Sequence, residues 1–350
     1  MKKSMLLAAM AAVAMTSCSN NEFDDQPVSG SNGLVKIEIG QKVQGIETKA
    51  AIATGDRVEA TIIATSGAAP ADWGTFVPVT ENTFADGATW SATTFANVSV
   101  GSFEAGTNQA IGLNPTLYAN PATGPTGGAT LTGIAPKGTV ENGKVLFSVL
   151  DGQQDIMTAE TTIQNQVVMN NMSPFSLTFD HRTAQLRFRF AAVNNAGTAA
   201  WDDASIKIKS VTVKKTFVPS AVKLGDPLTV EWTKTAQNLL FDNFTTNEVP
   251  KTYGTTAAST PDFVTLDKAA LVKPGVAVEL DVIVTIDGVD KAYTAIKPSK
   301  SGGVLTTVEG KFHNISLTIK KPAIPTGTPE IVATATVTEW VEGDEGSAEL

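Results

Sequence analysis

Cysteine and histidine are scarce in this sequence, which holds one Cys and two His in 350 residues. A single Cys excludes an internal disulfide framework and any Cys-cluster metal site. Two His leave little room for zinc binding or His-based catalysis, so we expect no metal and no other cofactor. Charged residues make up only 17% of the chain, and 26 basic against 35 acidic side chains give a net charge of −9. This balance argues against a protein that binds nucleic acid or an anionic membrane.

Small polar and turn-forming residues take the place of charge. Thr, Ser, Asn and Gln supply most of the remaining polarity, beside 29 Gly and 17 Pro. This composition is typical of a secreted β-protein rather than of a helical cytosolic enzyme. At ~150 residues per domain, the length suggests about two domains, each large enough to bury its own core.

The first residues have the pattern of a targeting segment. A basic start, Met1–Lys3, is followed by a mostly apolar run, Ser4–Ala14. The run is shorter than the ~20 apolar residues that a transmembrane helix needs. Small residues then lead to Cys18, as in a bacterial lipobox; the alternative is a plain secretory signal with an incidental Cys. We predict a signal peptide at 1–17 and lipidation of Cys18, so that acyl chains anchor the precursor in the outer membrane.

Alternating apolar and polar residues predict β-strands along most of the chain, and no segment shows sustained helical periodicity. A flip of the apolar parity at Ser210 indicates a bulge, or a strand that is buried on both faces. Residues 114–138 contain Pro115, Pro121, Pro125 and several Gly, which predicts a long loop. The strands that we expect most clearly are Leu34–Ile39, Arg57–Ala64, Phe95–Val100, Leu186–Phe190, Ile206–Lys214, Val276–Ile286, Lys311–Ile319 and Ile331–Trp340.

Two hairpins have strong turn signals. Val140–Leu150 contains Asn142-Gly143, and Val276–Ile296 contains Asp287-Gly288. Such dipeptides favour the two-residue turns of β-hairpins. Strands at ~10-residue spacing with Gly, Pro and Asn between them suggest β-sandwiches.

The residues that could carry chemistry are few. Asp180 and His181 are neighbours, but adjacent residues of a strand point to opposite faces, so Asp180 cannot easily orient His181. His313 shares strand parity with Ile315 and Leu317, which predicts a core histidine. No G-x-S-x-G elbow, P-loop or EF-hand loop occurs. The five tryptophans could form a glycan platform or, as the alternative, pack in the core. They are Trp73, Trp90, Trp201, Trp232 and Trp340.

Four segments in a fixed order are similar to motifs of one protein family. Gln153–Ala159 is similar to D-(L/I)-(M/L)-x-A, and Leu177–Leu186 to F-x-H-x-x-A-x-L. Gly310–Leu317 is similar to G-x-x-Y-x-(Y/I)-x-(I/L), with His313 at the usual Tyr position. Val332–Trp340 is similar to the terminal V-x-A-x-(I/V)-x-x-W. Together, and behind a lipobox, these segments resemble the fimbrillin family, the type V pilins of Gram-negative anaerobes.

The resemblance implies an all-β fold of two tandem transthyretin-like β-sandwich domains. We expect the N-terminal domain at 50–175 and the C-terminal domain at 176–350, with the boundary at Asn171–Pro174. It also implies a lipoprotein precursor that is exported to the cell surface, and a mature protein in the fimbria.

The resemblance further implies that surface proteolysis removes a lipidated propeptide, 18–49, together with the first strand. Thr48-Lys49-Ala50 is similar to the family's cleavage site, with Lys in place of the usual Arg. Cleavage is therefore expected between Lys49 and Ala50. Arg57 is the rival site, although it begins a strand pattern, where a protease finds less accessible backbone.

Assembly by strand exchange is the last implication of the resemblance. A sandwich without one strand exposes unpaired N–H and C=O groups, and a donated strand restores the ladder and the apolar face. Leu34–Ile39 is the expected self-strand, and 328–350 is the expected donor segment. The alternative for this segment is an ordinary last strand of the second sandwich. The donor residues that share one apolar face are Ile331, Ala333, Ala335 and Val337.

The sequence therefore predicts a structural subunit of a type V surface pilus with a role in adhesion, and no enzymatic activity. Its expected partners are other pilin subunits, in a homo- or hetero-polymer. The alternative is a monomeric or tip-located surface lipoprotein adhesin that binds a host protein or glycan. A β-sandwich hydrolase is disfavoured by the scarcity of His and by the lack of a nucleophile motif.

Overall fold

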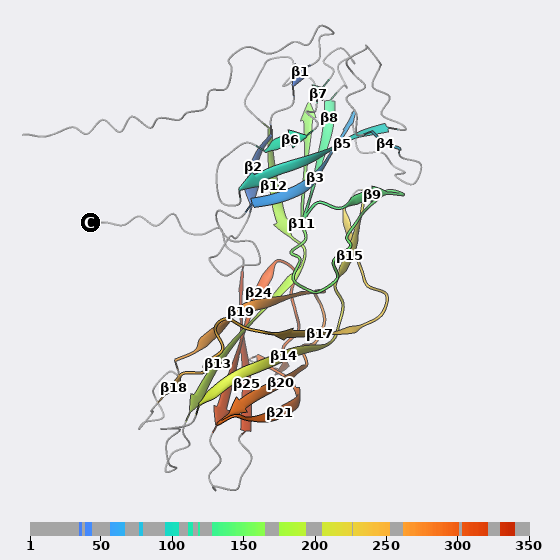
Figure 1. Ribbon diagram of the computed structural model, residues 1–350. Helices are drawn as coiled ribbons and strands as arrows, with labels where there is room; N and C mark the ends of the chain where they lie inside the picture. The colour runs from blue at the N-terminus through green and yellow to red at the C-terminus, as the bar shows by residue number, and fades with distance from the viewer. Residues whose placement is uncertain are drawn as a thin grey trace, which may run out of the picture.

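Every regular element in the described part of the chain is a β-strand. The computed structural model describes residues 35–36, 39–43, 57–66, 77–79, 95–104, 111–114, 118–119, 128–164, 175–193, 205–225, 227–252, 262–300, 303–320 and 330–339. The predicted all-β fold is confirmed. Figure 1 shows an upper and a lower group of strands, which we call the N-terminal lobe (β1–β8, β11 and β12) and the C-terminal lobe (β13, β14 and β17–β25).

The N-terminal lobe is built on an eight-stranded sheet. Its order is β2-β12-β11-β8-β3-β5-β4, with β6 paired to β5, while β1 and β7 form a separate pair. The central strands β11, β8 and β3 are antiparallel to their neighbours in this order. The strands are β1 (Val35–Lys36), β2 (Ile39–Val43), β3 (Arg57–Ser66), β4 (Val77–Val79), β5 (Phe95–Glu104), β6 (Gly112–Asn114), β7 (Tyr118–Ala119), β8 (Gly128–Ala135), β11 (Met157–Gln164) and β12 (Phe175–His181).

The C-terminal lobe is a β-sandwich. A seven-stranded sheet, β18-β13-β24-β25-β22-β23 with β19 paired to β13, faces a four-stranded sheet, β17-β14-β20-β21. The apolar residues that alternate along β13, β14, β20 and β24 meet in one core between the two sheets. The strands are β13 (Ala184–Val193), β14 (Ile206–Thr216), β17 (Gln237–Asp242), β18 (Lys251–Thr252), β19 (Val264–Val272), β20 (Leu280–Ile286), β21 (Val289–Ile296), β22 (Ser299–Lys300), β23 (Gly303–Val304), β24 (Lys311–Lys320) and β25 (Glu330–Glu339).

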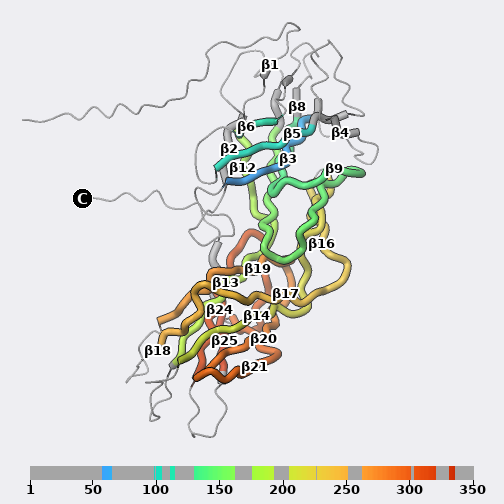
Figure 2. The backbone as a smooth tube through the Cα atoms, in the orientation of Figure 1, coloured from blue at the N-terminus to red at the C-terminus, as the bar shows by residue number. Residues whose placement is uncertain are grey.

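A further four-stranded sheet, which we call the bridging sheet, combines strands from distant parts of the chain. Its order is β16-β15-β10-β9. Figure 2 shows the green backbone that carries β9 and the yellow backbone that carries β16 in the same part of the molecule, where β10 pairs with β15. The strands are β9 (Thr139–Glu141), β10 (Lys144–Leu146), β15 (Pro219–Lys223) and β16 (Thr229–Trp232).

Both predicted hairpin turns are confirmed. Asn142 and Gly143 have φ angles of 48° and 71°, and Asp287 and Gly288 have 49° and 80°. Positive φ at both central residues is what a type I′ turn requires, and it matches the twist of the flanking strands. The bulge predicted at Ser210 is also present, because the pairing of β14 with β20 shifts register there.

The long loop predicted for residues 114–138 is wrong. It contains β7 and also β8, which lies between β11 and β3 inside the eight-stranded sheet. Thr130 and Thr132 are as well buried as Leu131 and Ile134, so both faces of β8 are covered. A strand covered on both faces needs no polar alternation, and the pattern that predicts half-buried strands therefore missed it.

The sheets do not divide where the domain boundary was expected. Asn171–Pro174 lies outside the described residues. Beyond it, β12 belongs to the sheet of the N-terminal lobe, and β15 and β16 belong to the bridging sheet. The chain enters the C-terminal lobe between His181 and Ala184, where β13 begins. The division into domains at 50–175 and 176–350 stays a prediction.

Candidate functional site

One of the predicted processing residues lies in the described part of the chain. Cys18, Lys49 and Ala50 lie outside it. Arg57 is the first residue of β3, and its Nε donates a hydrogen bond to Ser102 Oγ on β5 over 2.9 Å. A backbone held in a strand is a poor protease substrate, which agrees with the lower rank of Arg57 as a cleavage site. Cleavage after Lys49 stays a prediction.

The expected self-strand Leu34–Ile39 corresponds to β1 and to the start of β2. β2 pairs in parallel with β12, in a register that runs from Ile39 opposite Phe175 to Val43 opposite Phe179. β2 is the terminal strand of the sheet, and β11 lies on the other side of β12. Removal of β2 would therefore leave one edge of β12 without its ladder partner.

The expected donor residues lie on β25, inside the C-terminal lobe of their own chain. Residues 330–339 pair antiparallel with residues 311–320 of β24 along the full length of both strands. Ile331, Ala333 and Ala335 pack against the core of the C-terminal lobe. The backbone of Val337 lies opposite His313. This arrangement agrees with the alternative interpretation, an ordinary last strand, and the donor role stays a prediction.

A buried contact between a carboxyl group and a histidine joins two of the segments that carry the fimbrillin-like motifs. Asp155 precedes β11, and its Oδ2 lies 2.6 Å from Nδ1 of His181, the last residue of β12. The Thr183 hydroxyl donates to the other oxygen of Asp155 over 3.0 Å. The side chains of Asp155 and His181 are 0% and 2% exposed. This cluster lies where the chain leaves the N-terminal lobe.

The cluster does not have the geometry of an acyl-transfer triad. In a triad the nucleophilic hydroxyl faces the histidine ring, and the carboxylate holds the ring from the other side. Here the Thr183 hydroxyl bonds to Asp155 instead, and all three groups are buried. The arrangement can fix the end of β12 against the start of β11, which supports a structural role for His181.

Sequence reasoning found His181 but missed Asp155 as its partner. The two residues are 26 positions apart, and only the pairing of β11 with β12 brings them together. The available signal was the motif at Gln153–Ala159, whose Asp is the residue that contacts the His of the second motif. Two motifs that resemble those of one family therefore meet in one contact.

His313 lies on the core side of β24 and is fully buried, as predicted. Its Nε2 accepts a hydrogen bond from the Val308 N–H over 3.1 Å, so the neutral ring carries its proton on Nδ1. Nδ1 is buried and has no hydrogen-bond partner in the described part of the chain. Burial disfavours the charged ring and lowers the pKa of His313 from its ordinary value of 6.5 to about 4.

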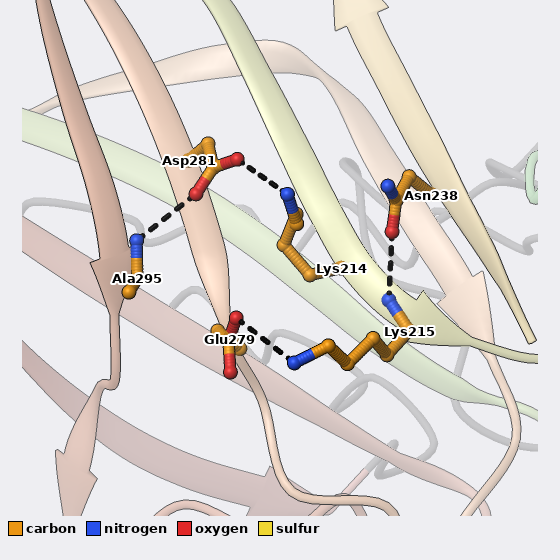
Figure 3. Close-up of polar contacts among 6 residues, drawn as sticks. All are labelled: Lys214, Lys215, Asn238, Glu279, Asp281 and Ala295. Atoms are coloured by element: carbon orange, nitrogen blue, oxygen red, sulfur yellow. Dashed lines mark hydrogen bonds and ion pairs between the residues drawn. The ribbon is translucent and has the colours of Figure 1, made fainter.

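The four-stranded sheet of the C-terminal lobe has bulges beside both of its outer strands (Figure 3). Lys215 has a φ of 49°, and its N–H donates to Asn238 Oδ1 on β17 over 3.0 Å. Ala295 on β21 has a φ of 54°, and its N–H donates to Asp281 Oδ1 over 3.0 Å. Bulges twist an edge away from a new strand, so these edges suit strand addition less than a regular edge does.

Ion pairs hold the same region. Lys214 Nζ lies 2.7 Å from Asp281 Oδ2, and Lys215 Nζ lies 3.6 Å from Glu279 Oε1 (Figure 3). The hydrogen bond from Lys214 keeps the pKa of Asp281 below its ordinary value. Since these pairs are near the surface, each contributes at most about 1 kcal/mol. Their effect is to fix the bulges rather than to stabilise the lobe strongly.

The remaining features to report are the tryptophans, metal-binding groups and membrane-spanning helices. Trp232, at the end of β16, is half-buried, and the remaining tryptophans lie outside the described residues. No group of three or more His, Cys, Asp or Glu side chains is placed to hold a metal ion in the described ranges. In the same ranges, no helix has the length and apolar character to cross a membrane.

The comparison with protein families identifies the family of this chain. A model of the fimbrillin-like family matches residues 93–340, which is most of the chain. The chain belongs to the fimbrillin-like family, and the resemblance stated from the sequence is confirmed. A comparison with curated proteins finds no match.

Solved structures of fimbrial proteins are similar to this chain. One is a fimbrial protein from Bacteroides vulgatus, with a TM-score of 0.49 and 15% identity over 87% of this chain and 99% of that chain. Another is the fimbrial anchor protein Mfa2 from Porphyromonas gingivalis, with a TM-score of 0.31 and 10% identity over 88% of this chain and 99% of that chain.

Proposed function

We propose that this chain is a structural subunit of a type V surface fimbria with a role in adhesion, and that other pilin subunits are its partners. Membership of the fimbrillin-like family supports the proposal. The observation that carries it is the edge position of β2, which pairs with β12 and precedes Lys49 in the sequence. Cleavage after Lys49 separates β2, and the lipidated Cys18 of the outer-membrane precursor, from the rest of the chain.

Loss of β2 creates a site for another strand. The N–H and C=O groups of Phe175–Phe179 that face β2 would lose their partners, beside the fully buried side chains of Leu177 and Phe179. Backbone groups without partners cost about as much free energy as a lost hydrogen bond. A strand from a neighbouring subunit, for which Ile331–Val337 is the proposed donor, would restore these bonds.

The pairing of β25 within its own chain favours a second candidate. This is a monomeric or tip-located surface lipoprotein adhesin that binds a host protein or glycan. Before β25 could be donated, it would have to break its ladder with β24 and withdraw Ile331, Ala333 and Ala335 from the core. A subunit that receives a strand at β12 but keeps β25 in place would end a polymer.

The N-terminal residue of the protein purified from the cell surface tests the first proposal. We expect Ala50, and we expect Lys49→Gln to leave the precursor uncleaved and the cells without fimbriae. Lys42→Gln, a change of the same type on β2, is the matched control and should be processed normally. A surface protein that begins only at lipidated Cys18 would contradict the polymerising role and support the second candidate.

The role of β25 is tested by placing a carboxylate on its core side. Ala335 packs against the core, whereas Thr334 on the same strand is exposed. Burial of an unpaired carboxylate costs on the order of several kcal/mol. If β25 is donated, Ala335→Asp and Val337→Asp abolish fimbriae while the purified monomer melts like the wild type. A large loss of monomer stability shows an ordinary last strand, and Thr334→Asp should change neither property.

A further inference from the structure

We propose that residues 148–153 and 219–232 form a reciprocal clasp, which makes the two lobes unfold as one unit and holds them in one relative orientation. The segment 148–153, here called the strap, follows β10 and packs on the C-terminal lobe. The segment 219–232, here called the hairpin, is β15 and β16 and packs on the N-terminal lobe. Each half of the chain thus lends one segment to the other half.

The hairpin is bound by backbone and side-chain contacts to β10, which follows β8 of the N-terminal lobe along the chain. β15 pairs antiparallel with β10, and two further backbone bonds extend the pairing, from Phe147 N to Ser220 O and from Leu224 N to Gly143 O. Lys144 Nζ lies 2.8 Å from Glu231 Oε2 on β16. The pairing places the apolar side of the hairpin against the eight-stranded sheet.

The apolar contacts of the hairpin are part of the N-terminal lobe. Val222 and Leu224 are buried in one cluster with Ile63 of β3 and Ile134 of β8. Leu228 packs against the same cluster and is half-buried. Departure of the hairpin would expose the inner face of β3 and β8, so the N-terminal lobe needs residues that lie between two strands of the C-terminal lobe.

The strap contacts the C-terminal lobe mainly through the buried Gly152, while residues 148–151 and Gln153 are exposed. The O atom of Gly152 accepts a hydrogen bond from the Leu271 N–H on β19 over 2.7 Å. Gly152 is buried, has a φ of 74°, and leaves no room for a Cβ because the Leu239 side chain occupies that place. Leu239 belongs to the core of the C-terminal lobe. The Leu150 carbonyl accepts a further hydrogen bond from Gln237 Nε2.

The chain passes directly from the N-terminal lobe to the C-terminal lobe at residues 181–184, which lie between the strap and the hairpin in the sequence. At this connection, Arg182 N donates to Ile156 O over 2.8 Å, and Gly310 N donates to Thr183 O over 3.0 Å. In the described part of the chain, the lobes are therefore joined at this direct connection and by the two exchanged segments. Neither lobe can unfold alone without exposing apolar residues of the other, which is the condition for cooperative unfolding.

Amide hydrogen exchange of the full chain, followed by mass spectrometry, tests the clasp. Leu224→Ala weakens the hairpin on the N-terminal lobe, and Gly152→Ala strains the strap on the C-terminal lobe. In each variant we expect the slowest amides of β3 and β8, and those of β14 and β20, to exchange faster by the same factor, at least about tenfold.

Independent lobes give a different result. If Leu224→Ala accelerates exchange only in β3 and β8, or Gly152→Ala only in β14 and β20, the clasp is overturned. Leu240→Ala is the matched control, because Leu240 is 62% exposed beside Leu239 on β17, and it should leave both lobes unchanged. If Leu224→Ala prevents folding, Leu228→Ala makes the same comparison with a smaller factor.

Discussion

Among single residues, His313 has a pKa that burial lowers. The pKa of its ring is about 4 in the native protein and 6.5 in its ordinary state. Between these values the unfolded chain takes up a proton that the native protein does not, so the free energy of unfolding falls as the pH falls. This contribution is complete above pH 6.5. About 3 kcal/mol of it is lost by pH ~4, and urea denaturation across this range measures the loss.

The variant His313→Phe isolates this group from the other acids and bases of the chain. It removes the unpaired Nδ1–H and the proton uptake together, while His181 stays in place. We expect the free energy of unfolding of the variant to change less than that of the wild type between neutral pH and pH ~4. Equal pH dependence in the two proteins would contradict the burial of a neutral His313.

Asp155 is the second residue with a specific expectation. Asp155→Asn keeps the side-chain volume but removes the charge and one of the acceptors that His181 and Thr183 use. We expect a loss of about 2–4 kcal/mol in the free energy of unfolding, and about 1 kcal/mol for Thr183→Val. Since the two residues are in direct contact, the losses of the two single variants should not add up to the loss of the double variant. Additive losses in the denaturation cycle would exclude this contact.

Among the strands, β8 depends on a glycine. A Cβ on Gly133 would lie 2.8 Å from Cζ of Phe179, whose ring stacks on Phe103 at a centroid distance of 5.3 Å. Gly133→Ala must therefore displace a fully buried ring between β8 and β12, at a cost of about 1–3 kcal/mol. Thermal unfolding measures the cost. Gly112→Ala on β6 is the control, because its nearest neighbour lies 3.6 Å away; an equal loss there would refute the packing argument.

For the whole molecule, the testable expectation concerns its anchor. Cys18→Ala should abolish lipidation and surface delivery, because the acyl chains that hold the precursor in the membrane are attached to the chain's single Cys. Metabolic labelling with a fatty acid measures this directly. Ser19→Ala, which keeps the Cys, should be labelled like the wild type. Label on the Cys18→Ala protein would rule out this anchor.

What the sequence alone determined is local. Alternation along β14, β20 and β24 predicted strands because one face of each packs in the core, and Asn142-Gly143 and Asp287-Gly288 predicted turns because positive φ favours these residues. The scarcity of Cys and His excluded disulfide and Cys-cluster metal chemistry. Four short motifs were enough for the family, since each carries several fixed residue types in a fixed order.

Only the tertiary structure decided which distant segments meet. It brought Asp155 to His181, placed β8 inside a sheet, and paired β10 with β15. The periodicity of a strand indicates which of its faces is buried, but it does not identify the segment that packs on that face. Where both faces are covered, as on β8, even the periodicity disappears. The pairing of β25 with β24 was likewise open, because the same alternating face fits its own core or that of a neighbour.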